Sequence, residues 1–244
     1  MNGFLENLFP NLFDYMKEFQ KAVAATWQMF WLAGILSFLI GLCLGVILEA
    51  AKPSGIRPNK GLYHITDVVV NVFRSIPFVI LLIFLIPLTR AITGTAIGVK
   101  GAIIPLVFGC VPFYTRQVET ALANVDPGKI EAARSMGCTT KDIIFRVYLH
   151  EAVPELIRVT TTTAISLIGL TTMAGAVGAG GIGSFAINYG QSLHHQDIVN
   201  VCVILLLILV SLLQTLGNAL AKKTTNREAA EKVRLSNNRL YLTY

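Results

Sequence analysis

The stretch AVAATWQMFWLAGILSFLIGLCLGVIL, residues 22–48, contains 27 residues and no charged side chain. Residues 159–196 and 198–221 are likewise uncharged. Each run exceeds the roughly 20 residues that a helix needs to cross about 30 Å of hydrocarbon. Of the 244 residues, 54% are hydrophobic and only 14% are charged, which is unusual for a soluble domain. The sequence therefore predicts an all-α membrane protein.

Two further apolar segments carry charges near one end. Residues 68–89 contain Arg74 near the start, and residues 101–125 contain Arg116 and Glu119 towards the end. Both are interpreted as spans, because a long side chain near a helix end can reach the headgroups. The alternative is a hairpin that enters and leaves the membrane on one side. The interpretation gives five transmembrane helices, at about 22–48, 68–90, 101–125, 156–180 and 198–221.

The basic residues are unevenly distributed between the connecting segments. If five spans cross and the amino terminus lies outside, sixteen of the twenty Lys and Arg residues lie on the inner side. Positive residues stay on the cytoplasmic side during insertion, so this orientation is favoured and the carboxyl terminus lies in the cytoplasm. Topology explains the net charge of +6, and no nucleic-acid partner is expected. The outer basic residues are Lys17, Lys21, Arg90 and Lys100.

The segments outside the spans predict three units. Residues 1–21 place apolar side chains at helical spacing opposite charged ones, which indicates a helix in the outer interface, broken or capped near Pro10. Residues 22–221 form the transmembrane domain, with a cytoplasmic loop at 126–154. Residues 222–244 form a charged cytoplasmic tail, predicted to be a surface helix or partly disordered.

The loop at 126–154 contains clear helix signals. Asp126 suits an N-cap and Pro127 the first helical position, while Gly137 suits a left-handed C-terminal stop. Thr139 and Asp142 form the pattern of a capping box, which predicts a second helix from residue 140 to about 151. The loop is therefore expected to be helix, glycine elbow, helix, lying along the membrane surface.

The first of these helices has a face on which another protein could dock. Ile130, Ala133 and Met136 share one face, and Ala132 and Ala133 allow a partner to approach closely. The alternative is an amphipathic connecting loop that packs only on its own membrane domain.

Three motifs in this chain resemble those of one transporter family. EAARSMG at residues 131–137 resembles the "EAA" loop of bacterial ABC importer permeases, and FRSIPF at 73–78 resembles the amino-acid importer version of the second span. MAGAVGAGGIG at 173–183 resembles the fourth-span region of the methionine importer's membrane subunit. The similarity extends from about residue 26 to 223. One departure is His150, because the family usually has Leu-Pro where this chain has Leu149-His150.

The resemblance implies a fold, an activity and partners. It implies a type I ABC importer permease fold in the bacterial cytoplasmic (inner) membrane, and a pathway for an amino acid, with methionine the first choice. The permease would pair with a second copy of itself, with two ABC ATPase subunits that bind ATP-Mg, and with an extracytoplasmic substrate-binding lipoprotein. This chain itself would hold no cofactor, and lipid would surround it.

The resemblance also assigns roles to residues. It places an ATPase groove around the first loop helix, and the coupling residues would be Ile130, Glu131, Ala132, Ala133, Met136 and Gly137. Met173 would lie at the pore constriction, with Gly175 and Gly178 beside it, although ordinary helix packing also explains Met173. Structural roles are assigned to Arg74, Pro77, Arg116 and Glu119; the last two could pair at i, i+3 or line the pore mouth.

Other functions find little support in the sequence. The chain lacks G-x-x-x-x-G-K-[ST], so it has no P-loop and the energy must come from a partner or a gradient. The G-x-G-x-x-G match at 178–183 follows an apolar segment rather than a strand, so no dinucleotide site is expected. His194, His195 and Asp197 have no further clustered partners, so no metal site is expected. A permease for another amino acid or small peptide, a gradient-driven secondary transporter and an intramembrane enzyme remain as alternatives.

Overall fold

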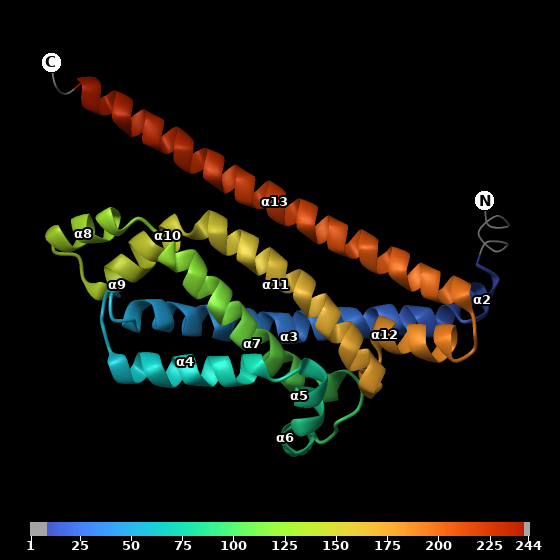
Figure 1. The fold of residues 1–244 in the computed structure, drawn as a ribbon. Coiled ribbons are helices and arrows are strands. Elements are labelled where there is room, and N and C mark those ends of the chain that lie inside the picture. The colour runs from blue at the N-terminus through green and yellow to red at the C-terminus, as the bar shows by residue number, and fades with distance from the viewer. Residues whose placement is uncertain (1–8, 242–244) are drawn as a thin grey trace.

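The computed structural model of the protein describes residues 9–241, with side chains as far as residue 225. Every regular element in this part of the chain is helical, as the all-α prediction requires (Figure 1). The bent pair α4 (Lys60–Ser75) and α5 (Phe78–Phe84) supplies a fifth candidate crossing if the two count as one span. The other segments long and apolar enough to cross a membrane are α3 (Met16–Ala51), α7 (Gly98–Ala123), Val153–Ala179, and α13 (Gln196–Tyr241) as far as Thr225.

Shorter elements lie at the two ends of the long helices. The shorter α-helices are α2 (Pro10–Asp14), α6 (Ile86–Thr93), α8 (Pro127–Ser135), α9 (Thr140–Asp142), α10 (Leu149–Glu151) and α12 (Gly181–Phe185). Helix α11 (Val153–Ala174) continues into the π-helical segment η2, and the π-helical segments are η1 (Ile143–Tyr148), η2 (Gly175–Ala179) and η3 (Ala186–Gln191). In Figure 1, α8, α9 and α10 lie where α3 ends and α4 begins; we call this the loop end. Helices α2 and α12 lie at the opposite end.

Close packing of α3 against α7 forms the centre of the bundle. Gly45 on α3 allows this contact, because a Cβ there would lie 2.6 Å from the side chain of Val118 on α7. Small residues at such crossings bring membrane helices together without a hydrophobic driving force. Buried side chains then form one cluster in the middle, around Leu106 and Leu167, and one at each end.

The second predicted span differs from the structure. Helix α4 begins eight residues earlier than residue 68, where the Asn59 side chain caps it by accepting a hydrogen bond from the Leu62 amide at 3.1 Å. It ends at Ser75 because Ile76 precedes a proline and is extended, and α5 then leaves at 103° to α4. The predicted segment 68–90 is therefore the end of α4 followed by α5 and most of α6, rather than one straight helix.

The predicted terminal units also have different boundaries in the structure. Residues 1–8 of the predicted interfacial segment lie outside the described residues; Pro10 then starts α2 at a first helical position, and residues 16–21 belong to α3. The predicted tail, residues 222–244, continues α13 as helix through Tyr241.

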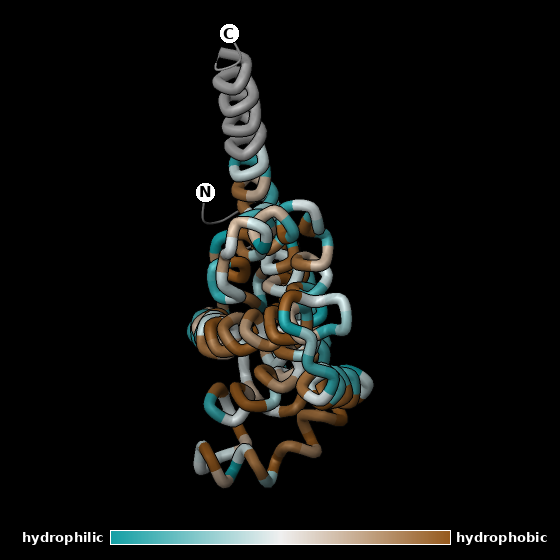
Figure 2. The backbone as a smooth tube through the Cα atoms, turned by 90° about the vertical axis from the view of Figure 1, so that its left-hand side faces the viewer, coloured by the Kyte–Doolittle hydropathy of each residue, from teal (hydrophilic) through white to brown (hydrophobic). Residues whose placement is uncertain are grey.

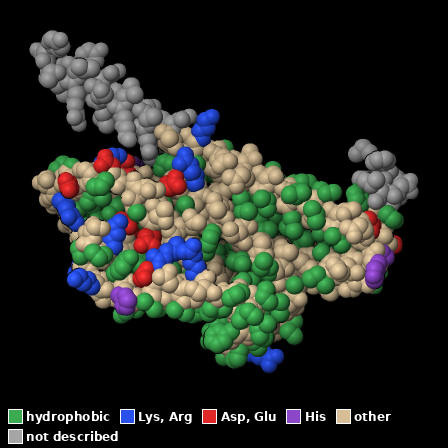
Figure 3. All heavy atoms as spheres, viewed as in Figure 1, with side chains coloured by type: hydrophobic (Ala, Val, Ile, Leu, Met, Phe, Trp, Pro, Cys, Tyr) green, Lys and Arg blue, Asp and Glu red, His purple; other side chains and the backbone are tan. Residues whose placement is uncertain are grey.

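Charged and hydrophobic side chains occupy different parts of the surface along the long axis of the molecule. Figure 3 shows Lys, Arg, Asp and Glu side chains gathered at the loop end, with hydrophobic side chains over the middle of the molecule. Figure 2, viewed from the loop end, shows α5 and α6, lowest in the view, as largely apolar. The loop end therefore has the composition of a surface in water, and the middle that of a surface in lipid.

Candidate functional site

Helix α8 is bounded by the local signals predicted for it. The Asp126 carboxylate accepts a hydrogen bond from the Gly128 amide at 2.9 Å, and Pro127 occupies the first turn. At the other end Gly137 has φ +78°, its amide donates to the Arg134 carbonyl at 2.9 Å, and the Cys138 amide donates to the Ala133 carbonyl at 3.1 Å. These two bonds form a Schellman motif. The predicted cap and glycine elbow are confirmed.

The second loop helix is also confirmed, with an unexpected π-helical centre. The Thr139 hydroxyl accepts a hydrogen bond from the Asp142 amide, and the Asp142 carboxylate accepts in return from Thr139, which completes the capping box. The hydrogen bonds that the carboxylate accepts from the Thr139 hydroxyl and, second, from the Thr139 amide lower the pKa of the Asp142 carboxyl below its ordinary value. The helix then runs through α9, η1 and α10 to Glu151. A π-helical segment changes the phase of the side chains that follow it.

Polar contacts attach the loop to the rest of the protein. The Arg134 guanidinium donates to the carbonyl of Ile56 at 2.9 Å and to that of Gly55 at 3.3 Å, both in the segment between α3 and α4. Lys129 of α8 forms an ion pair with Glu151 of α10, so the two loop helices are joined to each other. Because none of these contacts joins residues at helical spacing, the sequence pattern did not predict them.

The second loop helix is joined to α3 through a buried carboxylate. The Tyr148 hydroxyl donates to Oε1 of Glu49 at 3.3 Å, and the Lys52 ammonium lies 2.5 Å from the same oxygen. Burial, followed by the nearby Glu49 carboxylate, raises the pKa of the Tyr148 hydroxyl to about 12. The hydroxyl therefore keeps its proton near neutral pH. This contact joins the second loop helix to the last turn of α3.

The exposed surface of α8 differs from the face predicted for docking. Ala133 is buried and Ile130 is partly buried, and both pack within the cluster at the loop end. Met136 is the C-cap of α8 and is 76% exposed, so it does not pack with them. Glu131, Ala132 and Gly137 are exposed with it. The π-helical segment η1 adds Phe145, which is 68% exposed. A partner would therefore meet Met136 and the elbow, while Ile130 and Ala133 hold α8 in place.

The predicted pore residues lie at a break after α11. Met173 is half exposed near the end of α11, whereas Gly175 is buried. The break itself is at Gly178, whose φ of +94° is in the left-handed region, and Gly180 follows with φ +81°. A Cβ on Gly175 would lie 2.7 Å from the Gly180 carbonyl oxygen, so the chain folds back closely on itself here.

Two arginines assigned structural roles have very different surroundings. Arg116 donates to the Glu119 carboxylate at 2.7 Å and to the Asn71 amide oxygen at 2.8 Å, and it is ion-paired with Asp67. The predicted Arg116–Glu119 pair is confirmed. Arg74, in contrast, has no ion pair or side-chain hydrogen bond among the described side chains and is exposed, next to the break at Pro77.

The remaining polar candidates serve as helix attachments. Asp197 accepts hydrogen bonds from the backbone and the side-chain amide of Asn11, each at 3.0 Å, and so fixes α2 to the start of α13. Within the described residues no group of three metal-ligand side chains lies together, including around His194 and His195.

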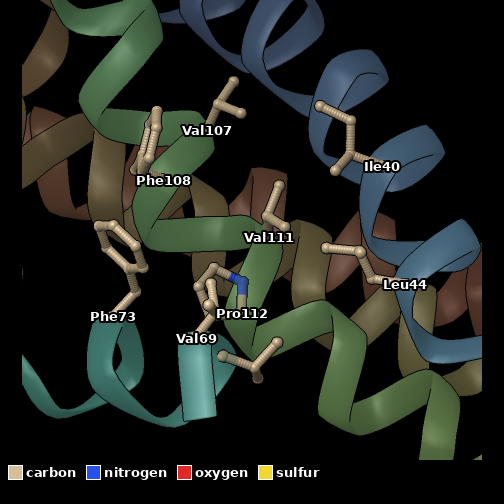
Figure 4. Close-up of a pocket in the computed structure, with 9 residues that line it drawn as sticks. Ile40, Leu44, Val69, Phe73, Val107, Phe108, Val111 and Pro112 are labelled. Carbon is tan, nitrogen blue, oxygen red and sulfur yellow. The ribbon is translucent and has the colours of Figure 1, made fainter. Parts of the chain in front are cut away.

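Between α3, α4 and α7 lies a pocket of ≈220 Å³ (Figure 4). Its walls are entirely apolar, with Ile40, Phe73 and Phe108 among them. It therefore offers no polar group with which to recognise a solute.

These features define a class of protein. Membrane-length helices carry, at one end, a charged loop that is capped, joined to α3 and exposed at its elbow. This is an integral membrane protein with an exposed, charged loop at one end of its helices.

The comparisons with known proteins give the family. The family model described as "Binding-protein-dependent transport system inner membrane component" matches residues 41–227. The chain belongs to this family, and it is an inner-membrane component of such a transport system.

The chain is similar to several proteins that are named as methionine transport permeases. The chain is 41% identical over 208 residues to the probable D-methionine transport system permease protein MetI of Vibrio cholerae, covering 84% of this chain and 92% of the relative. It is 44% identical over 172 residues to the methionine import system permease protein MetP of Bacillus subtilis, covering 70% and 78%. It is 45% identical over 155 residues to the D-methionine transport system permease protein MetI of Escherichia coli K12, covering 64% and 71%.

Solved structures agree on the fold. A chain of the MetNI methionine ABC transporter, in an inward-facing conformation, is 42% identical and superposes with a TM-score of 0.84, covering 86% of this chain and 98% of that one. A chain of an amino acid ABC transporter crystallised with histidines is 16% identical, with a TM-score of 0.73 and coverage of 88% and 98%. The second likeness shows the fold alone.

Proposed function

We propose that this chain is the permease subunit of an ATP-binding-cassette importer and forms the translocation pathway for an amino acid, methionine before others. The observation that carries the proposal is the long match to permeases named for methionine transport. The exposed elbow of the loop also supports the proposal. A permease without a P-loop needs a surface on which an ATPase can act, and the elbow offers one.

The proposed topology has five crossings in a type I importer permease fold, with the amino terminus outside and the carboxyl terminus in the cytoplasm. The asymmetry of Lys and Arg supports this orientation. The bent pair α4–α5 would serve as the second crossing; the break at Ile76–Pro77 is acceptable in a membrane where protein or a water-filled cavity covers the free backbone groups.

Coupling would occur through the loop end. An ATPase groove that receives α8 would contact Glu131, Ala132, Met136 and Gly137, which are exposed. Ile130 and Ala133 would contribute from beneath by fixing α8 to the bundle. The Tyr148–Glu49 contact would then pass the movement to α3.

The gate of the pathway would lie at the break after α11. Met173 projects from the last turns of α11 with half of its surface exposed, and its flexible apolar side chain suits a seal against its copy in a second permease. Gly175 and Gly178 permit the sharp return of the chain that fixes its position.

The proposed assembly contains two permeases, two ABC ATPases that bind ATP-Mg, and an extracytoplasmic substrate-binding lipoprotein, all within lipid. No cofactor is assigned to this chain.

Reconstitution into proteoliposomes tests the proposal. The permease, its partner ATPase and the binding protein should together take up radiolabelled methionine only when ATP is present on the ATPase side. Uptake should persist when ionophores collapse the proton and sodium gradients. Uptake that follows a gradient without the ATPase would instead establish a secondary transporter. Uptake of another amino acid or a small peptide in preference to methionine would correct the substrate.

A further inference from the structure

Arg74 lies in the last turn of α4, just before the apolar helix α5. Because α4 begins at Lys60, Arg74 lies roughly 21 Å along the helix from that end, at 1.5 Å per residue. It lies three residues beyond Asn71, the last residue of α4 in the polar cluster around Arg116. A charged side chain within a membrane span is costly, and such residues usually face a partner or a water-filled cavity.

Two arginines of this region, Arg116 and Arg74, differ in their partners among the described side chains. Arg116 is held by Asp67, Glu119 and Asn71. Arg74 makes no ion pair or side-chain hydrogen bond with the described side chains, and the residue is exposed. The fold therefore compensates the charge of Arg116 but leaves that of Arg74 available.

Arg74 lines a cavity of ≈190 Å³ between α4, α5, α7 and α11. The cavity meets α7 at Cys110 and α11 at Ser166, which lie near the middle of their helices. Its other walls are largely apolar and include the rings of Phe78 and Phe113. The volume is below the roughly 300–1,000 Å³ of pockets for drug-sized ligands, so it suits a small solute.

A glycine shapes one wall of this cavity. A Cβ on Gly109 would lie 2.8 Å from the ring of Phe78, so the absence of a side chain at Gly109 lets that ring pack closely against α7. The result is one cationic group and one hydroxyl, from Ser166, at the edge of an aromatic pocket. The neighbouring pocket in Figure 4 shares Phe73 with it but has no polar wall.

We infer that Arg74 binds the carboxylate of the transported solute, at a site inside the permease whose aromatic wall receives an apolar side chain. This inference rests on the proposed function and deepens it. A guanidinium can hold a carboxylate through two parallel hydrogen bonds. The substrate class is a small amino acid with an apolar side chain.

Uptake by the full complex with its ATPase and binding protein tests the inference. Arg74→Met should lower the initial rate of ATP-driven methionine uptake about tenfold or more, the loss expected for one charge-assisted pair. Arg74→Lys keeps the charge but loses the paired geometry, and should give an intermediate rate. Arg90→Met, which removes a positive charge from α6 outside the cavity, is the matched control and should transport close to the wild-type rate.

A second measurement reports binding without transport. In a Ser166→Cys variant, methionine should slow alkylation of residue 166 by a small maleimide, followed by mass spectrometry, and methionine amide should not. The slowing should disappear when Arg74→Met is added. The melting temperature and ATPase assembly of Arg74→Met should equal or exceed those of the wild type, because an uncompensated charge has been removed.

Three results would overturn the inference. The first is wild-type uptake by Arg74→Met. The second is loss of uptake together with loss of assembly or a lower melting temperature, which would indicate that Arg74 has a structural partner such as a lipid phosphate or the second permease. The third is equal protection of residue 166 by methionine and its amide. If the wild type itself shows no ATP-driven uptake, the proposed function fails, while the alkylation result still decides whether the cavity binds a carboxylate.

Discussion

Two interruptions of the long helices are held in place by opposite means. The loop at residues 126–154 is fixed by polar side chains, through Arg134 to the carbonyl of Ile56 and through Tyr148 to Glu49. The break at residues 175–183 is fixed by the lack of side chains, since the backbone takes left-handed values and packs directly on neighbouring segments. Each substitution in the loop should therefore remove one attachment and leave the others. A side chain added to a glycine of the break should instead disrupt the packing of the whole break.

The largest effect is expected at the glycine-rich break. A Cβ on Gly183 would lie 2.1 Å from the Thr172 carbonyl oxygen, a backbone atom that cannot move aside easily. Gly183→Val should destabilise the protein by about 3 kcal/mol through overpacking, measured as a lower melting temperature in detergent. Gly169→Ala is the matched control, because nothing lies within 4 Å of its added Cβ; it should leave the melting temperature unchanged or raise it. Equal melting temperatures for both variants would refute the account of close packing.

The second effect is expected at the elbow of the loop. Gly137 has φ +78°, and a residue with a side chain pays about 1–2 kcal/mol for this conformation although no neighbour obstructs it. Gly137→Val should distort the exposed elbow, reduce co-purification of the ATPase and lower ATP-driven uptake, while insertion into the membrane continues.

Gly61→Val provides the comparison for the elbow variant. Gly61 lies in the first turn of α4, has no positive φ and has only an ordinary contact with Asn59, so this variant should bind the ATPase normally. Normal ATPase binding and uptake by Gly137→Val would show that the elbow has no part in coupling.

A smaller effect is expected from detaching the loop. Arg134→Met removes the hydrogen bonds to the carbonyls of Gly55 and Ile56 and should cost about 1 kcal/mol. Amide hydrogen exchange should become faster in residues 52–59 and in α8 together. Arg146→Met is the control, because Arg146 is highly exposed and its pair with Asp142 spans 3.5 Å, so exchange should stay close to that of the wild type. Faster exchange in α8 alone would show that the contact does not join the two segments.

The same contrast explains which features the sequence could predict. Caps depend on residues a few positions apart, so Asp126, Gly137 and the Thr139–Asp142 pair were predicted correctly from local chemistry. Arg116 and Glu119 are also close in the chain, at i, i+3. The all-helical membrane fold followed from uncharged runs alone.

Features that depend on tertiary structure could not be predicted in the same way. The carbonyls that Arg134 contacts belong to a segment nearly 80 residues earlier, and any residue type can supply a carbonyl. The exposed position of Met136 depends on how α8 packs, which helical spacing alone does not determine. The predicted second span began at residue 68, whereas α4 begins at Lys60, where the Asn59 side chain caps it.

The smallest effect is expected at the capping box, where pH provides the test. The Thr139 hydrogen bonds hold the pKa of Asp142 below its ordinary value, so its contribution to helix stability is fully present above the pKa of the unfolded chain, about 3.9, and is lost as the pH falls through the lower folded value. Amide exchange of residues 142–145, corrected for its intrinsic pH dependence, should therefore lose protection in the wild type below about pH 4. Asp142→Asn, which carries no titrating group, should exchange slightly faster at neutral pH and show no such acid step. A matching acid step in the variant would assign the titration to another group, and the carboxylate would then have no measurable part in holding the second loop helix.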